Sequence, residues 1–227
     1  MADDCIDDGL AAALLLGDGR LPTGGYAHST GLESAARRGW VSSPEQLSAF
    51  IRGRAATTGL MNAAFAVVAR REAEDIGRLL ELNAHLEART PSPALRRTGV
   101  WLGRTLLRAL QGIAPSPELE RLPPGLQQPI VFGVVARQLG LSERATAAAL
   151  LHETVTGPAI AAVKVMNIDP FAAHRAIAQA LPLLSATAAE AVGCADARFE
   201  DLPALGSPLS DVAAELHEED DARLFVS

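Results

Sequence analysis

Apolar residues recur at steps of three and four along most of the chain, a spacing that places them on one face of an α-helix. The longest of these stripes starts near Glu45 and comprises Leu47, Phe50, Ile51, Ala55, Thr58, Met61, Phe65 and Val68. Ser43 precedes it with Gln46 three residues later, the pattern of a capping box. Gly53 and Gly59 lie within the stripe and weaken the helix, because glycine is a poor helix former. The pattern predicts a long helix with a point of weakness near its middle.

Similar periodicity predicts helices elsewhere in the chain. The segments are 10–16, 30–38, 72–88, 94–110, 130–139, 142–156, 160–166 and 170–192, with a break at Gly157 and Pro158. The proline-rich stretch 112–128 is interpreted as a surface loop within one bundle, because helices flank it on both sides. We therefore expect an all-α fold: a single domain over residues 1–227, built as a bundle of about eight to ten helices with flexible termini.

The helix expected over 94–110 carries two kinds of side chain. Trp101, Leu102, Leu106 and Leu110 are expected to point inward, while Arg96, Arg97, Arg104 and Arg108 remain available to solvent or a partner. Residues 37–108 hold twelve arginines against six acidic residues, a local charge of +6 in a chain whose net charge is −7. Because the whole chain is acidic and no helix-turn-helix pattern accompanies the arginines, we expect no nucleic-acid binding.

Both ends of the chain are acidic. Residues 1–9 form an acidic N-terminal tail, and residues 200–227 form a C-terminal tail in which helical periodicity fades after Phe199. The final residues include Leu224 and Phe225, whose exposure on a free end would be unfavourable. We expect this end to be buried on the domain or on a partner.

The composition fits a compact helical protein. Hydrophobic residues make up 48% of the 227 residues but aromatic residues only 4%, and alanine and leucine dominate, which favours closely packed helices. No apolar run reaches 18 residues, and no cationic-then-apolar signal opens the chain. We expect a cytoplasmic protein with no membrane segment.

Cysteine and histidine spacing gives no sign of a metal or redox site within one chain. Cys5 and Cys194 are far apart, and the five histidines show neither His-x-His nor His-x-x-x-His spacing. A symmetric dimer could still pair one histidine or cysteine across its axis. Lys164, the only lysine, has apolar neighbours, so it must extend to solvent, pair with an acid or face another chain.

The stretch from Asp18 to Glu33 departs from the helical pattern. It packs one proline and four glycines with Tyr26, His28 and several hydroxyl groups into sixteen residues. Such a composition is typical of a loop whose backbone adopts conformations that side chains would forbid. Ser29 or Thr30 can cap the helix that follows, and Glu33 lies in its first turns.

Two chemical interpretations of this loop are disfavoured. A phosphate-binding P-loop needs a lysine after its second glycine, and this stretch has none. His28 beside Ser29 suggests a base and a nucleophile, but adjacent residues rarely face each other and no aspartate is placed to orient the ring. We interpret these side chains as hydrogen-bonding partners within a tight loop, and we expect no catalytic residues and no cofactor.

Together these features resemble the UreF family of urease accessory proteins. Its members carry a loop of the form Leu-Pro-x-Gly-Gly-Phe/Tyr-Ser/Ala-x-Ser-x-Gly-Leu-Glu. The matching residues here are Leu21, Pro22, Gly24, Gly25, Tyr26, Ala27, Ser29, Gly31, Leu32 and Glu33. Gly39-Trp40-Val41, the segment 129–140, the helix around Lys164 and the closing Arg223-Leu224-Phe225 follow in the family's order, so the resemblance spans nearly the whole chain.

The resemblance implies a non-catalytic assembly factor. UreF-like proteins dimerise, bind the accessory protein UreD (also called UreH) and recruit the GTPase UreG, which carries nickel to apo-urease. It also implies which residues bind partners, namely Gly24, Gly25, Tyr26, His28, Ser29, Glu33 and Lys164 for UreG or the dimer, and His217, Arg223, Leu224 and Phe225 for UreD. At one landmark the chain has Glu215-Leu216-His217-Glu218 where the family often has Met-Arg-His-Glu.

Two other functions remain open at this point. The chain could act directly on GTP hydrolysis by placing an arginine or Lys164 near the nucleotide of UreG, as activating proteins do. It could also be an unrelated helical protein that binds a small molecule or catalyses a reaction. A large polar pocket would favour this last alternative.

Overall fold

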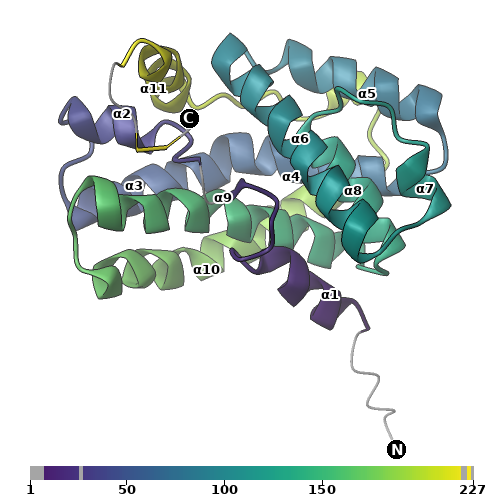
Figure 1. Ribbon diagram of the computed structural model, residues 1–227, viewed down its shortest axis with the longest axis horizontal. Helices are drawn as coiled ribbons and strands as arrows, with labels where there is room; N and C mark the ends of the chain where they lie inside the picture. The colour runs from purple at the N-terminus through teal and green to yellow at the C-terminus, as the bar shows by residue number, and fades with distance from the viewer. Residues whose placement is uncertain (1–7, 26–27, 221–223, 226–227) are drawn as a thin grey trace, which may run out of the picture.

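The computed structural model describes residues 8–25, 28–220 and 224–225, and over these residues it contains helices and no strand (Figure 1). The α-helices are α1 (Asp8–Gly17), α2 (Leu32–Arg37), α3 (Pro44–Arg54), α4 (Leu60–Arg71), α5 (Ile76–Ala88), α6 (Pro93–Ile113), α7 (Pro117–Glu120), α8 (Gln128–Gln138), α9 (Glu143–Val165), α10 (Pro170–Gly193) and α11 (Pro208–Glu218). A π-helical turn, η2 (Ala55–Gly59), joins α3 to α4, and a 3-10 turn, η3 (Phe199–Asp201), follows α10. The all-α prediction is confirmed. With α3, η2 and α4 counted as one rod, the described residues form ten α-helices besides the short turn η3, within the predicted number.

The long helix predicted from Glu45 is the rod of α3, η2 and α4. The Ser43 hydroxyl caps it by accepting the Gln46 N–H at 3.3 Å, and the Gln46 side chain accepts the Ser42 N–H at 2.7 Å. The weakness expected around Gly53 and Gly59 is the π turn, where the backbone widens by one residue without breaking the rod.

Buried side chains form two clusters on either side of this rod. One gathers around Phe65 of α4 and Phe132 of α8, with contributions from α1, α5 and α6. The other lies between α3, α9 and α10 and includes Ile51 and Val155. Since α4 and α9 contribute to both clusters, these two helices tie the halves of the bundle together.

Helix α9 runs unbroken through Pro158, so the break predicted at Gly157 and Pro158 is wrong. A proline in a helix interior removes one backbone hydrogen bond and normally breaks the helix. Here Pro158 and Ala159 are buried, and α9 packs along α10, α4 and α1. Tertiary packing therefore outweighs the local preference of the sequence.

Helix α11 lies within the C-terminal segment, residues 200–227. It packs against α2 and the N-terminal end of α6 (Figure 1). Its buried face consists of Ser210, Ala213, Ala214 and His217, at helical spacing but without a large apolar side chain. Leu209, Val212, Ala213 and Leu216 do recur at helical spacing, so the interpretation that periodicity fades after Phe199 is wrong for this segment. Two of these four side chains, Leu209 and Val212, are exposed.

Among the helices that the structure describes, α10 alone is long and apolar enough, by length and composition, to cross a membrane. It packs against α9, α3 and α4 and contributes Ala176, Ala180 and Ala188 to a buried cluster.

Candidate functional site

The described part of the glycine-rich loop after α1 contacts α6 through Gly24 and α9 through Gly25. Gly24 has a φ of 79°, and a Cβ atom on it would lie 2.5 Å from the ring of Trp101 on α6. On the other side, Gly25 lies beside the carboxylate of Glu153 on α9. The loop therefore needs glycine at position 24 for both its backbone conformation and its contact with the indole ring.

His28 and Ser29 lie at the buried end of this loop. The His28 imidazole packs on Trp101 with 4.8 Å between ring centroids. The Ser29 hydroxyl accepts the Glu33 N–H at 3.2 Å, in the first turn of α2. The N-cap residue of α2 is Gly31, so the expected N-cap at Ser29 or Thr30 is wrong, although Ser29 still satisfies one of the first N–H groups of the helix. Both side chains are buried, with exposed fractions of 2% and 0%. They therefore brace the loop from inside.

The pKa of His28 is lowered from 6.5 to about 4, mainly by burial and to a smaller extent by the neighbouring His217. Between these values the unfolded chain binds a proton that the folded chain excludes. The stabilisation is therefore complete above pH 6.5 and is lost as the pH falls toward 4. We expect the free energy of unfolding to drop by roughly 2 kcal/mol between pH 7.5 and pH 5 from this group, as measured by urea titration.

The variant His28→Gln should flatten this pH dependence, although its stability at pH 7.5 will also change. His174, on the exposed side of α10, provides the matched control, and His174→Gln should leave the slope as it is. An unchanged slope in His28→Gln would contradict the assignment.

Glu33 connects the loop to the C-terminal end of the chain. Its carboxylate is fully buried and accepts the Leu224 N–H at 2.8 Å and the Phe225 N–H at 3.0 Å. The Arg37 guanidinium donates to the same carboxylate at 2.8 Å. His217 is also buried, and its Nε2 atom lies 3.2 Å from the Phe225 carbonyl oxygen. Glu33 thus forms one hydrogen-bonded cluster with residues that lie 191 and 192 positions away from it in the sequence.

Helix α11 is fastened to the rest of the molecule by its acidic residues. The Glu215 carboxylate accepts the Ala94 N–H at 2.9 Å and the Ser92 hydroxyl, so it caps the N-terminus of α6. Glu218 pairs with Arg97 on α6, and Asp220 lies 3.2 Å from Arg38 next to α2. Arg38 lowers the pKa of Asp220, which keeps this contact ionised. The described part of the C-terminal segment is therefore docked on α2 and α6.

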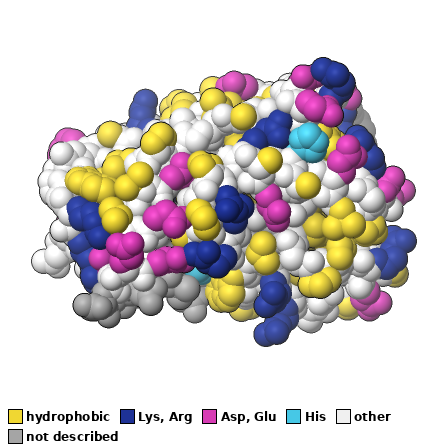
Figure 2. Space-filling view, turned by 90° about the horizontal axis from the view of Figure 1, so that it is seen from above, with side chains coloured by type: hydrophobic (Ala, Val, Ile, Leu, Met, Phe, Trp, Pro, Cys, Tyr) yellow, Lys and Arg dark blue, Asp and Glu magenta, His cyan; other side chains and the backbone are white. Residues whose placement is uncertain are grey.

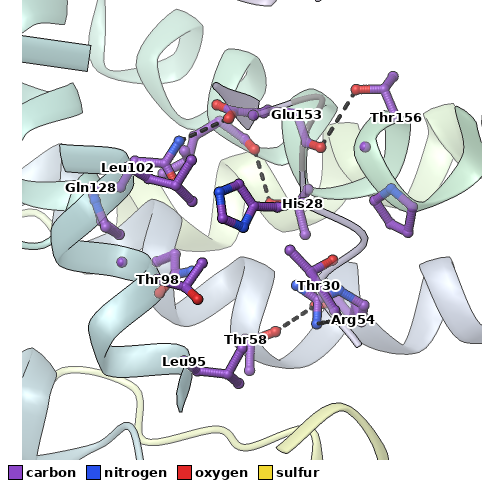
Figure 3. A pocket seen from close by; sticks show the side chains of 18 of the residues that line it. His28, Thr30, Arg54, Thr58, Leu95, Thr98, Leu102, Gln128, Glu153 and Thr156 are labelled. Carbon is purple, nitrogen blue, oxygen red and sulfur yellow. Dashed lines mark hydrogen bonds between the residues drawn. The ribbon is translucent and has the colours of Figure 1, made fainter. Parts of the chain in front are cut away.

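A cavity of about 590 Å³ lies beneath the loop, with walls from α4, α6 and α9, and with Arg54 and Phe225 on its lining. Figure 3 shows His28 between Glu153 on one side and Thr30 and Arg54 on the other. The Gln128 amide donates to Glu153 at 2.8 Å, while burial raises the pKa of this carboxyl. Arg54 donates to the Thr30 carbonyl at 3.3 Å, and burial lowers its pKa to about 10 against the opposing effect of Asp211.

The described side chains of this region hold the loop and its neighbours together. The Ser29 hydroxyl oxygen accepts the Glu33 N–H in the first turn of α2. Over the same described residues, no group of three or more His, Cys, Asp or Glu side chains is placed to hold a metal ion. The arrangement fixes a loop and a chain end against each other.

The residues expected to bind partners fall into three groups. His28, Ser29, Glu33 and His217 are buried, whereas Lys164 at the cavity rim and Leu224 are exposed, and Gly24, Gly25 and Phe225 are half-buried. Tyr26 and Arg223 lie outside the described residues. Lys164 extends to solvent, and it forms no ion pair with any described residue. Extension to solvent is one of the three outcomes that the sequence leaves open for Lys164.

The sequence does not predict the positions of two residues in this region, Arg54 and Trp101. Arg54 is not part of the apolar stripe in the sequence of its helix, yet in the structure it is buried under the loop. Trp101 was expected to point inward, and this is wrong in part, since 39% of its surface is exposed. The four-residue step from Arg97 to Trp101 places the indole on the arginine side of α6, and this spacing was the available signal.

Comparison with known proteins gives a consistent result. A sequence model of the family named UreF matches residues 41–181. The urease accessory protein UreF of Mycolicibacterium vanbaalenii is 35% identical over 218 residues, which is 96% of this chain and 99% of that protein. The proteins of the same name from Mycobacterium tuberculosis H37Rv and Mycobacterium marinum are 35% and 36% identical over 219 and 221 residues, with the same shares covered.

Proposed function

The chain belongs to the UreF family of urease accessory proteins, and we propose that it is a non-catalytic scaffold for urease maturation. In this role it binds UreD, recruits the GTPase UreG and so supports nickel insertion into apo-urease in the cytoplasm. We propose further that residues 1–227 act as one domain and form a homodimer. Family membership excludes the alternative of an unrelated ligand-binding protein.

The observation that carries this proposal is the Glu33 cluster. The glycine-rich loop and the C-terminal segment, each expected to bind a partner, meet at one buried carboxylate. We propose that a partner bound to one of these two regions affects the other through this carboxylate. A scaffold that must bind two proteins in a defined arrangement benefits from such a connection.

Exposed apolar side chains near this cluster support a role in protein binding. On α11, Leu209 and Val212 are 42% and 50% exposed, and Leu224 after it is 66% exposed. Apolar surface of this kind on a helix that is otherwise well fastened is typical of a protein interface. We assign the contact with UreD to these side chains, and a bracing role to the buried Glu33 and His217.

The proposal predicts that the double substitution Leu209→Asp with Val212→Asp weakens binding to cognate UreD at least about tenfold, because it places charges in an apolar contact. Copurification followed by mass determination by light scattering measures this. The matched control is Leu80→Asp with Ile113→Asp, since these residues are equally exposed on α5 and α6. Equal losses in both variants, or no complex with the intact chain, would contradict the assignment.

A second candidate role is direct regulation of GTP hydrolysis by UreG. The exposed Lys164 ammonium favours it, because a cation near the nucleotide can stabilise the transition state of phosphoryl transfer. A GTPase assay of UreG with and without this chain separates this role from that of a scaffold.

A further inference from the structure

One face of α6 carries a line of long cationic side chains around a tryptophan. Arg97, Trp101, Arg104 and Arg108 follow one another at steps of four, three and four residues, which puts them on the same side of the helix. All four are exposed. We refer to these four residues as the α6 stripe.

The charge of the α6 stripe is only partly compensated. Arg97 pairs with Glu218 of α11. Arg104 and Arg108 form no ion pair with any residue that the structure describes, whereas Arg78 and Arg71 each pair with two carboxylates. An anionic partner can therefore bind Arg104 and Arg108 without breaking an existing ion pair.

A hollow of about 400 Å³ opens beside the α6 stripe. Its lining residues are Glu87, Arg96, Arg97, Val100, Trp101, Arg104 and Gln127. Two of these side chains are held in place by hydrogen bonds. Arg96 donates to the Pro91 carbonyl at 3.0 Å, and Gln127 donates to the Arg96 carbonyl at 3.2 Å. Trp101 is fixed from behind by His28 and Gly24. The hollow thus combines a rigid aromatic wall with an arginine rim, the composition of a binding hot spot.

We propose that the α6 stripe docks an acidic helix of a partner protein. Carboxylates spaced by three and four residues on that helix pair with Arg104 and Arg108, and an apolar side chain between them enters the hollow beside Trp101. The spacing favours a helix, because carboxylates one turn apart match arginines one turn apart. The α6 stripe shares no residue with the Glu33 cluster, although Arg97 pairs with Glu218 of α11 and Trp101 packs on His28. The proposal goes beyond the scaffold role and does not rest on it.

A nucleic acid is a weaker candidate for the same surface. Glu87 lines the hollow, and Glu218 lies at one end of the α6 stripe. Figure 2, which looks onto the side of the molecule that carries α5, α6 and α11, shows acidic side chains interspersed among the basic ones. The continuous negative charge of a phosphate backbone would be repelled by these carboxylates, whereas the few carboxylates of a helix can be placed away from them.

Tryptophan fluorescence tests the proposal directly. The chain has two tryptophans, so the variant Trp40→Phe leaves Trp101 as the only one. The probe is a synthetic peptide of about 15 residues, a length at which isolated helices begin to form, with glutamates at three- and four-residue steps around one leucine. We expect a blue shift of Trp101 emission on binding, and an affinity that falls as salt is added.

In the same background, Arg104→Glu with Arg108→Glu should weaken peptide binding at least about tenfold, since two attractions become repulsions. The control is Arg52→Glu with Arg175→Glu, which makes the same change in net charge at exposed sites away from α6 and should stay within about twofold. Circular dichroism confirms that both variants fold. Equal weakening in the two variants, no shift of Trp101, or equally tight binding of an oligonucleotide with the same arginine dependence would overturn the proposal.

Discussion

Replacing Glu33 by alanine is expected to lower the free energy of unfolding by about 3 kcal/mol, since it removes a buried charged acceptor from three donors. The Leu224 and Phe225 amides and the Arg37 guanidinium all donate to this carboxylate. Without it, the two backbone N–H groups lose their partner, and the C-terminal segment is released from α2. Urea unfolding measures the stability, and hydrogen exchange at the Leu224 and Phe225 amides measures the release.

Two variants make the Glu33 experiment specific. Glu33→Gln keeps one acceptor oxygen and should fall between the wild type and Glu33→Ala in both measurements. Glu190→Ala, on the exposed face of α10, should change stability by less than about 0.5 kcal/mol. If Glu33→Ala left the exchange of both amides unchanged, the cluster would not hold the chain end.

Replacing Gly133 by valine is expected to cost about 4 kcal/mol or to prevent folding, because α4 and α8 cross at this residue. A Cβ atom on Gly133 would lie 2.3 Å from the Ala66 carbonyl oxygen and 2.8 Å from the Arg70 nitrogen. Both are backbone atoms, so the clash cannot be relieved by a side-chain rotation, and the two helices must separate. Thermal and urea unfolding measure the loss.

Gly53→Ala provides the control for this prediction. Gly53 lies in α3 with no heavy atom near the position of a Cβ, so alanine should stabilise the protein by up to about 1 kcal/mol through helix propensity. Equal effects at Gly53 and Gly133 would mean that the close crossing of α4 and α8 does not contribute to stability.

Local sequence patterns predict much of this fold because they report local physics. The stripe from Leu47 to Val68 and the Ser43 cap depend only on residues near in sequence, and both appear as expected. Pro158 shows the limit, since α9 continues through a residue that normally ends a helix. Helix α11 shows another, because Leu209, Val212, Ala213 and Leu216 recur at helical spacing, yet the face that is buried consists of serine, alanine and histidine.

The candidate site was predictable in its parts and not in its connections. The glycine-rich loop stands out by composition, and the resemblance to a family pointed to Glu33 and to the final residues. No local pattern could show that Glu33 accepts hydrogen bonds from Leu224 and Phe225, because nearly the whole chain lies between them. Nor could it show Arg54 beneath the loop, whose burial depends on how α3 packs against Thr30.

The measurement that tests the central claim most directly is the nickel content of cognate urease, purified from cells that produce all its other accessory proteins with or without this chain. The scaffold role predicts nickel-loaded, active urease with the chain and largely nickel-free enzyme without it. Glu33→Ala should give an intermediate content at equal protein levels. Equal nickel loading in the presence and absence of the chain would contradict the claim.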